Sequence, residues 1–166
     1  LPQLTDLFNA IYDAKYFTAL DCTEGFFQIP ILTEHKQRTA FITPHGLFHF
    51  KRSPFGFTNS PAKFQRTMNT IFEDGLYKRC VIYIDDILVF GKTEQQLQDN
   101  TAWVLARCRK FNVKLKLSKC LWMKETVDFL GFRISKTQNH MTGLRVLHWP
   151  LRILPWSQGL DEASVR

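Results

Sequence analysis

The stretch from Val81 to Phe90 constrains the fold of this chain more than any other. It reads Val-Ile-Tyr-Ile-Asp-Asp-Ile-Leu-Val-Phe, so two apolar runs enclose the adjacent acids Asp85 and Asp86. Short apolar runs rich in β-branched residues are typical of buried strands, and aspartate tolerates the backbone of a tight turn. The stretch therefore predicts a β-hairpin with both acids at its tip.

The two acids at the tip allow two interpretations. Asp85 and Asp86 are either polar turn residues exposed to water or part of a metal site, because a buried carboxylate without a partner is costly to desolvate. Asp21 ends a strand expected over residues 16–22 and would join them if the two strands are neighbours in one sheet. Three such carboxylates repel one another unless hard cations bind between them, and two Mg²⁺ ions held in this way can serve phosphoryl transfer.

Periodicity along the rest of the chain predicts an α+β fold. Apolar residues at helical spacing indicate helices over residues 4–11, from Ser60 as the cap to Gly75, and from Thr93 as the cap to Asn112. Further short strands are expected over residues 27–32, 39–43, 47–51, 114–117, 121–123 and 126–134. This order predicts helices on one face of a largely antiparallel sheet.

The composition favours a single globular domain with a polyanionic partner. The chain has 166 residues, of which 45% are hydrophobic, and a net charge of +7. Residues 101–124 contain no acid, and their cations form either a solvated face or a contact to phosphates. They are Arg107, Arg109, Lys110, Lys114, Lys116, Lys119 and Lys124. No apolar run approaches the roughly 20 residues of a membrane helix, and the four cysteines lack metal-site spacing, so we expect an intracellular protein with reduced cysteines and no membrane partner.

Five blocks then follow one another in an order typical of one family. They are Tyr16 to Asp21 with Gly25-Phe26; Arg38-Thr39-Ala40-Phe41; Pro54-Phe55-Gly56 through Phe64-Gln65-Arg66 to Asn69; Tyr83-Ile84-Asp85-Asp86; and Leu117 to Cys120 with Phe129-Leu130-Gly131. Over residues 1–135 they resemble the reverse transcriptases of gypsy-type long-terminal-repeat retrotransposons. The resemblance implies a right-hand polymerase palm, an antiparallel sheet with helices on one face, together with partial fingers.

The resemblance also implies an activity and its catalytic centre. The chain would be an RNA-directed DNA polymerase that adds deoxynucleotides from their triphosphates to a primer on an RNA or DNA template. Asp21, Asp85 and Asp86 would be the catalytic residues and would hold two Mg²⁺ ions, with Mn²⁺ as an alternative. A different reading is a catalytically inactive remnant that only binds nucleic acid.

Further site residues are carried over from the same blocks. Phe26, Phe55, Gly56 and Lys119 are the expected nucleotide-binding residues, and Phe129, Leu130 and Gly131 the expected primer grip. A rigid ring at Phe26 would exclude a 2′-hydroxyl, which speaks against an RNA-synthesising polymerase. Both phenylalanines have a plain core role as the alternative. Lys119 is either a proton donor to the leaving pyrophosphate or a phosphate-contacting or solvated lysine.

The chain departs from the family at both ends. It starts after the N-terminal fingers segment whose cations grip the triphosphate in the family. Residues 136–166 are expected to be an irregular C-terminal tail, in which Trp149-Pro150 comes early, and which is either truncated or frameshifted or an unusual genuine terminus. No protease, RNase H or integrase signature is recognisable, so other Pol polyprotein domains are expected partners. The resemblance places the protein in the cytoplasm, in a virus-like particle, or in the nucleus.

Overall fold

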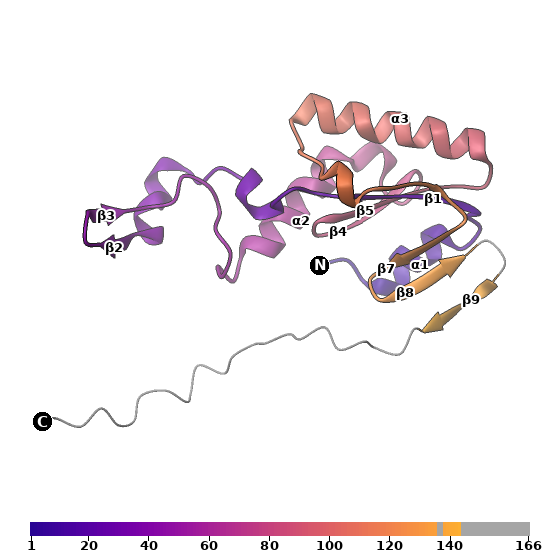
Figure 1. Ribbon diagram of the computed structural model, residues 1–166, viewed down its shortest axis with the longest axis horizontal. Helices are drawn as coiled ribbons and strands as arrows, with labels where there is room; N and C mark the ends of the chain where they lie inside the picture. The colour runs from indigo at the N-terminus through magenta and orange to yellow at the C-terminus, as the bar shows by residue number, and fades with distance from the viewer. Residues whose placement is uncertain (136–137, 144–166) are drawn as a thin grey trace, which may run out of the picture.

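A four-stranded antiparallel sheet forms the centre of the fold. The computed structural model describes residues 1–135 and 138–143, and its central sheet has the order β4-β5-β1-β6 (Figure 1). Each neighbouring pair is antiparallel. The strands are β1 (Tyr16–Asp21), β4 (Cys80–Tyr83), β5 (Asp86–Gly91) and β6 (Leu121–Lys124). The expected antiparallel palm sheet is thus confirmed.

The predicted β-hairpin is formed by β4 and β5. Its register pairs Tyr83 with Asp86, so the two-residue turn consists of Ile84 and Asp85. Ile84 has a φ of 52°, which places a β-branched residue in the left-handed region. The prediction that both acids occupy the tip is therefore wrong by one residue, because Asp86 is already the first residue of β5.

The helices α2 (Ser60–Ile71) and α3 (Glu94–Phe111) cover one face of the sheet. Figure 1 shows α3 lying across this face. The buried side chains that meet here come from both helices and from alternate positions of β1, β4 and β5; they include Leu20, Phe64, Met68, Ile82, Ile87, Val89, Leu97, Val104 and Cys108. All four cysteines are buried with free thiols, as expected for reduced core residues.

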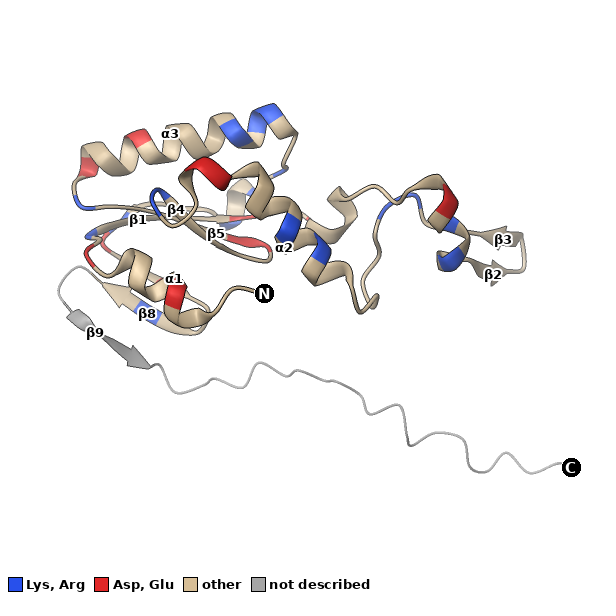
Figure 2. Ribbon diagram, turned by 180° about the vertical axis from the view of Figure 1, so that it is seen from behind, with Lys and Arg blue, Asp and Glu red and all other residues tan. Residues whose placement is uncertain are grey.

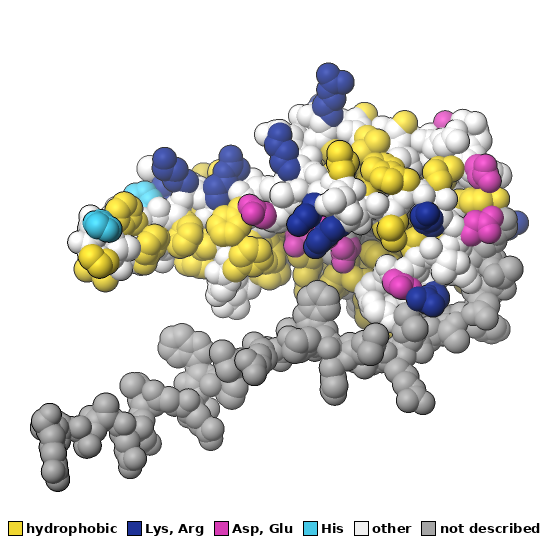
Figure 3. All heavy atoms as spheres, in the orientation of Figure 1, with side chains coloured by type: hydrophobic (Ala, Val, Ile, Leu, Met, Phe, Trp, Pro, Cys, Tyr) yellow, Lys and Arg dark blue, Asp and Glu magenta, His cyan; other side chains and the backbone are white. Residues whose placement is uncertain are grey.

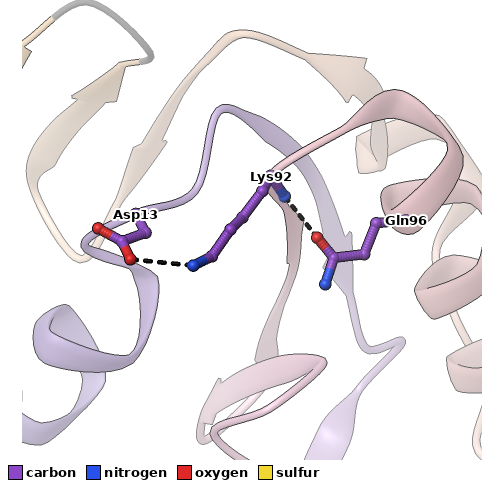
Figure 4. Close-up of polar contacts among 3 residues, drawn as sticks. All are labelled: Asp13, Lys92 and Gln96. Carbon is purple, nitrogen blue, oxygen red and sulfur yellow. Dashed lines mark hydrogen bonds and ion pairs between the residues drawn. The ribbon is translucent and has the colours of Figure 1, made fainter.

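The ends of these helices follow the sequence with three differences, the first of which is that α2 ends at Ile71 instead of reaching Gly75. Thr93 Oγ1 accepts the N–H of Gln96 at 3.1 Å, but Gln96 Oε1 accepts the N–H of Lys92 at 2.7 Å rather than that of Thr93 (Figure 4). Asn112 ends α3 in the left-handed conformation, as predicted. The cap of α2 is Asn59 instead of Ser60, because the Ser60 hydroxyl is hydrogen-bonded to Ser53 Oγ at 2.7 Å.

The opposite face of the sheet carries a helix as well. Here α1 (Leu4–Ile11) packs beside the hairpin of β7 (Thr126–Phe129) and β8 (Phe132–Ser135). The expected face thus carries the long helices α2 and α3, and α1 adds a cover on the second face. The second cover is needed because β5 is apolar at every position from Ile87 to Phe90, so its apolar side chains point to both faces of the sheet.

The chain continues as regular structure past Ser135. Strand β9 (Gln138–Gly143) pairs with β8, within the tail that was expected to be irregular. The strand expected over residues 126–134 is instead two strands, joined at Leu130 and Gly131, whose φ angles are 53° and 81°. Residues 144–166, and with them Trp149-Pro150, lie outside the described residues, and the domain boundary at 135 stays a prediction.

Residues 25–54 form an arm that extends away from the palm (Figure 1). It contains the 3₁₀ helices η1 (Gly25–Gln28) and η2 (Thr33–Thr39) and the hairpin of β2 (Phe41–Thr43) and β3 (Gly46–Phe48). The hairpin confirms the prediction, although both strands are shorter. The strand expected over residues 27–32 is wrong: the segment holds η1 and one bridge, Pro30 to Arg52.

Two 3₁₀ helices in the palm complete the described structure. They are η3 (Glu73–Gly75) and η4 (Leu117–Lys119). The strand expected over residues 114–117 is reduced to one isolated bridge between Leu115 and Cys22, because Lys116 already leads into η4. Among the described residues, no helix combines the length and the apolar character that crossing a membrane requires.

Candidate active site

The pairing of β1 with β5 brings two of the predicted catalytic acids together. Asp21 and Asp86 are Cα partners at the end of this pair, so both side chains point to the same side of the sheet. The N–H of Cys22 donates to the carbonyl oxygen of Asp85 at 2.9 Å, which holds the turn residue beside them. The inference that β1 is a neighbour of the hairpin is confirmed.

The pKa values of Asp85 and Asp86 are both raised at this end of the sheet. Partial burial, followed by the charges of Asp86 and Asp21, raises the pKa of Asp85 to about 6. Burial and then Asp21 also raise the pKa of Asp86, while Lys119 acts in the opposite direction. The Lys119 Nζ lies 3.5 Å from Asp21 Oδ2. This end of the sheet is thus an anionic site that a cation would stabilise.

The carboxylate of Asp85 lies against Gly25, the first residue of the arm. A Cβ atom at Gly25 would overlap Asp85 Oδ1, so glycine is needed here for space rather than for its backbone conformation. Among the described residues, Asp85 Oδ1 is buried and has no hydrogen-bond partner. An unpartnered buried carboxylate oxygen is costly, and a cation bound to this carboxylate would offset that cost.

The donor atoms suit a hard divalent cation, but they do not form a ready cage. Within the described part of the chain, no three His, Cys, Asp or Glu side chains are gathered closely enough to hold a metal ion. Asp21 is turned toward Lys119 and Asp85 toward Gly25. Carboxylate oxygens are nevertheless the ligands that Mg²⁺ prefers, and the unpartnered oxygen of Asp85 supports the same chemistry.

A glutamine that sequence reasoning left without a role holds the turn. Gln65 of α2 is buried, and its Oε1 accepts the N–H of Ile84 at 2.7 Å. Its Nε2 donates to the carbonyl oxygen of Ile82 at 3.1 Å and to Asn69 Oδ1 at 2.9 Å. The available signal was a polar residue between the apolar positions of an amphipathic helix, next to Phe64.

Comparisons with known proteins agree with this geometry. The family model described as "Reverse transcriptase (RNA-dependent DNA polymerase)" matches residues 2–134. The chain belongs to the reverse transcriptase family. It is 36% identical over 131 residues to the retrovirus-related Pol polyprotein from transposon 297 of Drosophila melanogaster, a match covering 79% of the chain and 12% of that protein. For the Pol polyprotein from transposon opus of the same organism, the identity is 38% over 135 residues, covering 81% and 14%.

A viral relative and two solved structures extend the comparison. The enzymatic polyprotein of Figwort mosaic virus (strain DxS) is 35% identical over 145 residues, which cover 85% of the chain and 22% of that protein. The foamy viral protease-reverse transcriptase in complex with RNA/DNA hybrid superposes with a TM-score of 0.69 at 26% identity, covering 77% of this chain and 18% of that one. Prototype Foamy Virus Protease-Reverse Transcriptase, as a CSH mutant, gives 0.74 at 26%, covering 85% and 19%. The chain thus spans about a fifth or less of these longer proteins, and its fold is the polymerase palm with part of the fingers.

The predicted nucleotide-binding aromatics of this reverse transcriptase domain form one cluster. The Phe26 ring is partly buried and meets Phe55 at 5.2 Å and Phe64 at 5.9 Å between centroids, both edge to face. Phe55 is 59% exposed, so it is a surface residue rather than the core residue of the alternative. Gly56 has a φ of 89°, a conformation that favours glycine. Because Phe26 follows Gly25, the cluster begins one residue from the contact with Asp85.

The three residues predicted as the primer grip lie in two different environments. Phe129 is buried in the core of the second sheet face, whereas Leu130 and Gly131 make the turn of the β7–β8 hairpin. Leu130 packs against the same core as Tyr83 of the β4–β5 hairpin. Phe129 packs in this core, and contact of Phe129, Leu130 and Gly131 with a primer stays a prediction.

Basic residues gather at the end of α3, within the stretch predicted to face phosphate, and on the arm, outside that stretch. Figure 2 shows Lys and Arg at the end of α3 and Asp and Glu nearer its start. Arg107 in this group pairs with Asp74 and lies over the Trp103 ring, so part of its charge is neutralised within the protein. On the arm, Figure 3 shows Lys and Arg along one edge, next to hydrophobic side chains. The arm thus adds a basic surface beyond residues 101–124.

Proposed function

We propose that this chain is the polymerase core of an RNA-directed DNA polymerase, from the Pol polyprotein of a gypsy-type long-terminal-repeat retrotransposon. The observation that carries the proposal is the register of β1 and β5, which pairs Asp21 with Asp86 beside the turn residue Asp85. The Pol polyproteins of transposons 297, opus and 412 are its relatives, and the ordered motif blocks favour the gypsy-type subgroup among transposons.

Asp21, Asp85 and Asp86 would hold the divalent cations of this enzyme, two Mg²⁺ or alternatively Mn²⁺. Bound there, such cations supply charge neutralisation for phosphoryl transfer, at the attacking primer 3′-hydroxyl and at the leaving pyrophosphate. The raised pKa of Asp85, caused by burial and by its two neighbours, supports this role because it reflects negative charge concentrated without a counterion. The motif setting of the three acids, in ordered blocks along the chain, supports the same role.

The chain's own side chains would orient the nucleotide. The Lys119 ammonium lies beside Asp21, where it would hold the proton that passes to pyrophosphate. Phe26 is supported by two rings, and a ring supported in this way resists displacement by a 2′-hydroxyl. The exposed Phe55 ring and Gly56 would lie against the incoming base pair, since glycine allows close approach of backbone.

The proposed partners are a primed RNA or DNA template and deoxynucleoside triphosphates. Solved foamy viral protease-reverse transcriptases are in complex with RNA/DNA hybrid and with double-stranded DNA, and this chain carries basic residues on α3 and on the arm (Figures 2 and 3). The turn at Leu130 and Gly131 would contact the primer. Other Pol domains would act in the same polyprotein, in a cytoplasmic virus-like particle or in the nucleus.

Primer extension on poly(rA)/oligo(dT) with Mg²⁺ tests the proposal. The variants are Asp85→Asn, which removes a proposed metal ligand, and Asp6→Asn, which removes an exposed acid on α1. Extension by the natural chain and by Asp6→Asn, but not by Asp85→Asn, is the expected result. Undiminished extension by Asp85→Asn would contradict it. A folded natural chain that binds primer-template in a salt-sensitive way without extending it would instead be the inactive remnant.

A further inference from the structure

The turn that carries Asp85 is bound to α2 by one side chain. Gln65 is 3% exposed, and its amide contacts the backbone on both sides of the turn: it accepts from Ile84 at 2.7 Å and donates to Ile82 at 3.1 Å. Asn69 Oδ1, one helical turn further along α2, accepts the second Nε2 proton at 2.9 Å. Both amide atoms of Gln65 are therefore hydrogen-bonded, and the group is held in a single orientation.

The turn needs an external partner because of its own conformation. Ile84 has a φ of 52°, and for a β-branched residue this left-handed backbone is a genuine outlier. Such conformations persist where the surrounding structure over-determines them, and they gather at functional sites. The ladder pairs Tyr83 with Asp86, so the N–H of Ile84 lies in the turn, where Gln65 provides its acceptor.

We propose that Gln65 is a positioning residue, which fixes the turn backbone and thereby sets where Asp85 is presented; the inference rests on the proposed polymerase function. Asp85 follows Ile84 directly, its carbonyl oxygen accepts from Cys22, and its carboxylate lies against Gly25. A change in the backbone of Ile84 therefore moves the carboxylate relative to Asp21 and Asp86. Gln65 thus acts on the reaction through the backbone, without touching the reacting atoms.

Replacement by methionine isolates the contribution of the amide. Gln65→Met keeps the length of the side chain and removes both the acceptor for Ile84 and the donor for Ile82. Misplacement of a catalytic group by about 1 Å costs on the order of 100-fold in rate, so kcat for primer extension should fall about 10-fold to 100-fold. The KM for deoxynucleotide should stay within about threefold, because the loss occurs in the transition state. Thr70→Ala, on the exposed side of the same helix, is the matched control.

The rate of amide hydrogen exchange at Ile84 measures how firmly the turn is held, and the measurement does not require catalytic activity. In the natural chain the N–H of Ile84 should exchange slowly, and Gln65→Met should speed it at least about tenfold, since an amide that loses a buried acceptor exchanges by local opening. The amide of Val89 in the middle of β5 should be unaffected. Unchanged exchange at Ile84, or equal acceleration at both amides, would overturn the proposal in favour of general packing.

A double-mutant cycle tests the connection to the backbone of Ile84. Glycine adopts left-handed conformations freely, so Ile84→Gly removes the need for an external partner. Gln65→Met should therefore cost less in kcat when Ile84→Gly is present than when it is absent. An equal cost in both backgrounds would contradict the proposal.

The variant Gln65→Glu and the binding of Mn²⁺ provide two further measurements on the turn. If Gln65→Met does not fold, Gln65→Glu retains an oxygen for the N–H of Ile84 and should retain its slow exchange; fast exchange in that variant would overturn the proposal. If the natural chain extends no primer, the polymerase proposal fails. The role of Gln65 is then decided by the rate of amide exchange at Ile84 and by the affinity for Mn²⁺, measured by electron paramagnetic resonance. Gln65→Met should weaken Mn²⁺ binding several-fold, and equal affinity would count against it.

Discussion

Asp21 and Asp86 face each other across the last paired position of β1 and β5. The backbone continues this pairing, because the N–H of Cys22 donates to the carbonyl oxygen of Asp85. The three acids are therefore brought together by main-chain hydrogen bonds and by the register of the strands. Replacing a carboxylate by an amide should leave the fold intact, so the effect of each acid on activity can be measured separately from its effect on folding.

The metal-free protein should lose stability as the pH rises from about 4 to about 6. The pKa of Asp85 is raised from 3.8 to about 6 in the folded chain, so the folded state binds more protons than the unfolded state in this window and is favoured at its acidic end. Asp85→Asn should reduce the dependence of the free energy of unfolding on pH in this window. Urea unfolding with a chelator, from pH 4 to 7.5, compares the natural chain with Asp85→Asn and Asp6→Asn. Parallel profiles for all three proteins would contradict the raised pKa of Asp85, which burial causes first and the charges of Asp86 and Asp21 second.

Lys119→Met should shift the binding of Mn²⁺ to higher pH. The Lys119 charge lowers the pKa of Asp86, against the opposing effects of burial and Asp21, and without it this carboxylate ionises at higher pH. A titration of Mn²⁺ affinity against pH measures the shift. The matched control is Lys92→Met, whose ammonium pairs with Asp13 at the other end of the sheet (Figure 4). The same shift in both variants would point to a general charge effect.

Gly25→Ala should inactivate the enzyme while leaving the palm folded. The added methyl group overlaps Asp85 Oδ1, so either the carboxylate or the start of the arm must move. A displacement of about 1 Å predicts a loss on the order of 100-fold in kcat. Primer extension measures this loss, and circular dichroism verifies the fold. Full activity would show that the carboxylate can leave Gly25 without cost.

Phe26→Ala should relax the discrimination between deoxynucleotides and ribonucleotides. Removal of the ring opens space between Phe55 and Phe64. The kcat/KM for a deoxynucleotide divided by that for the matching ribonucleotide should fall by about tenfold or more, which is the scale on which a steric pocket discriminates. Phe27→Ala is the matched control, since its ring also contacts Phe55, at 5.4 Å. An equal fall in the control would assign the effect to disruption of the aromatic cluster.

Thr93→Ala should destabilise the fold by about 1 kcal/mol, the usual contribution of an N-cap hydroxyl. Its Oγ1 accepts the N–H of Gln96 at the start of α3, which packs across the catalytic sheet. Urea unfolding provides the free energy of unfolding. Gln95→Ala, an exposed change in the first turn of the same helix, should alter the free energy of unfolding by less than about 0.5 kcal/mol. A similar cost for both variants would rule out a specific cap.

Features encoded by neighbouring residues were predictable from the sequence. The hairpin, the long helices and the position of Asn112 follow from local patterns. The structure of residues 27–32 could not be predicted from local patterns, because the Gln28 side chain is bound to a distant segment. Its Nε2 donates to the carbonyl oxygen of Lys114, and its Oε1 accepts the N–H of that residue. A propensity for strand was thus overruled by a contact across 86 positions.

The candidate site was likewise predictable in part from the sequence. The meeting of Asp21 with the hairpin could be inferred, because two buried strands ending in acids are readily neighbours in one sheet. The contacts of Gly25 and Gln65 could not, since both join segments whose approach depends on the whole fold. The turn shifted by one residue for the same reason: Gln65 stabilises a left-handed Ile84, which local preference alone disfavours.

The apolar character of β5 on both faces has a consequence for misfolding. Ile87 and Val89 enter one core, and Leu88 and Phe90 the other. Sliding β5 by one residue along β1 exchanges the two sets but still buries hydrophobic side chains. A molecule with this register shift would therefore differ little from the native one in solubility and compactness. The same slip carries Asp86 to the side of the sheet away from Asp21. A misaligned molecule of this kind would survive purification as a well-behaved protein and lower the measured activity of every preparation that contains it.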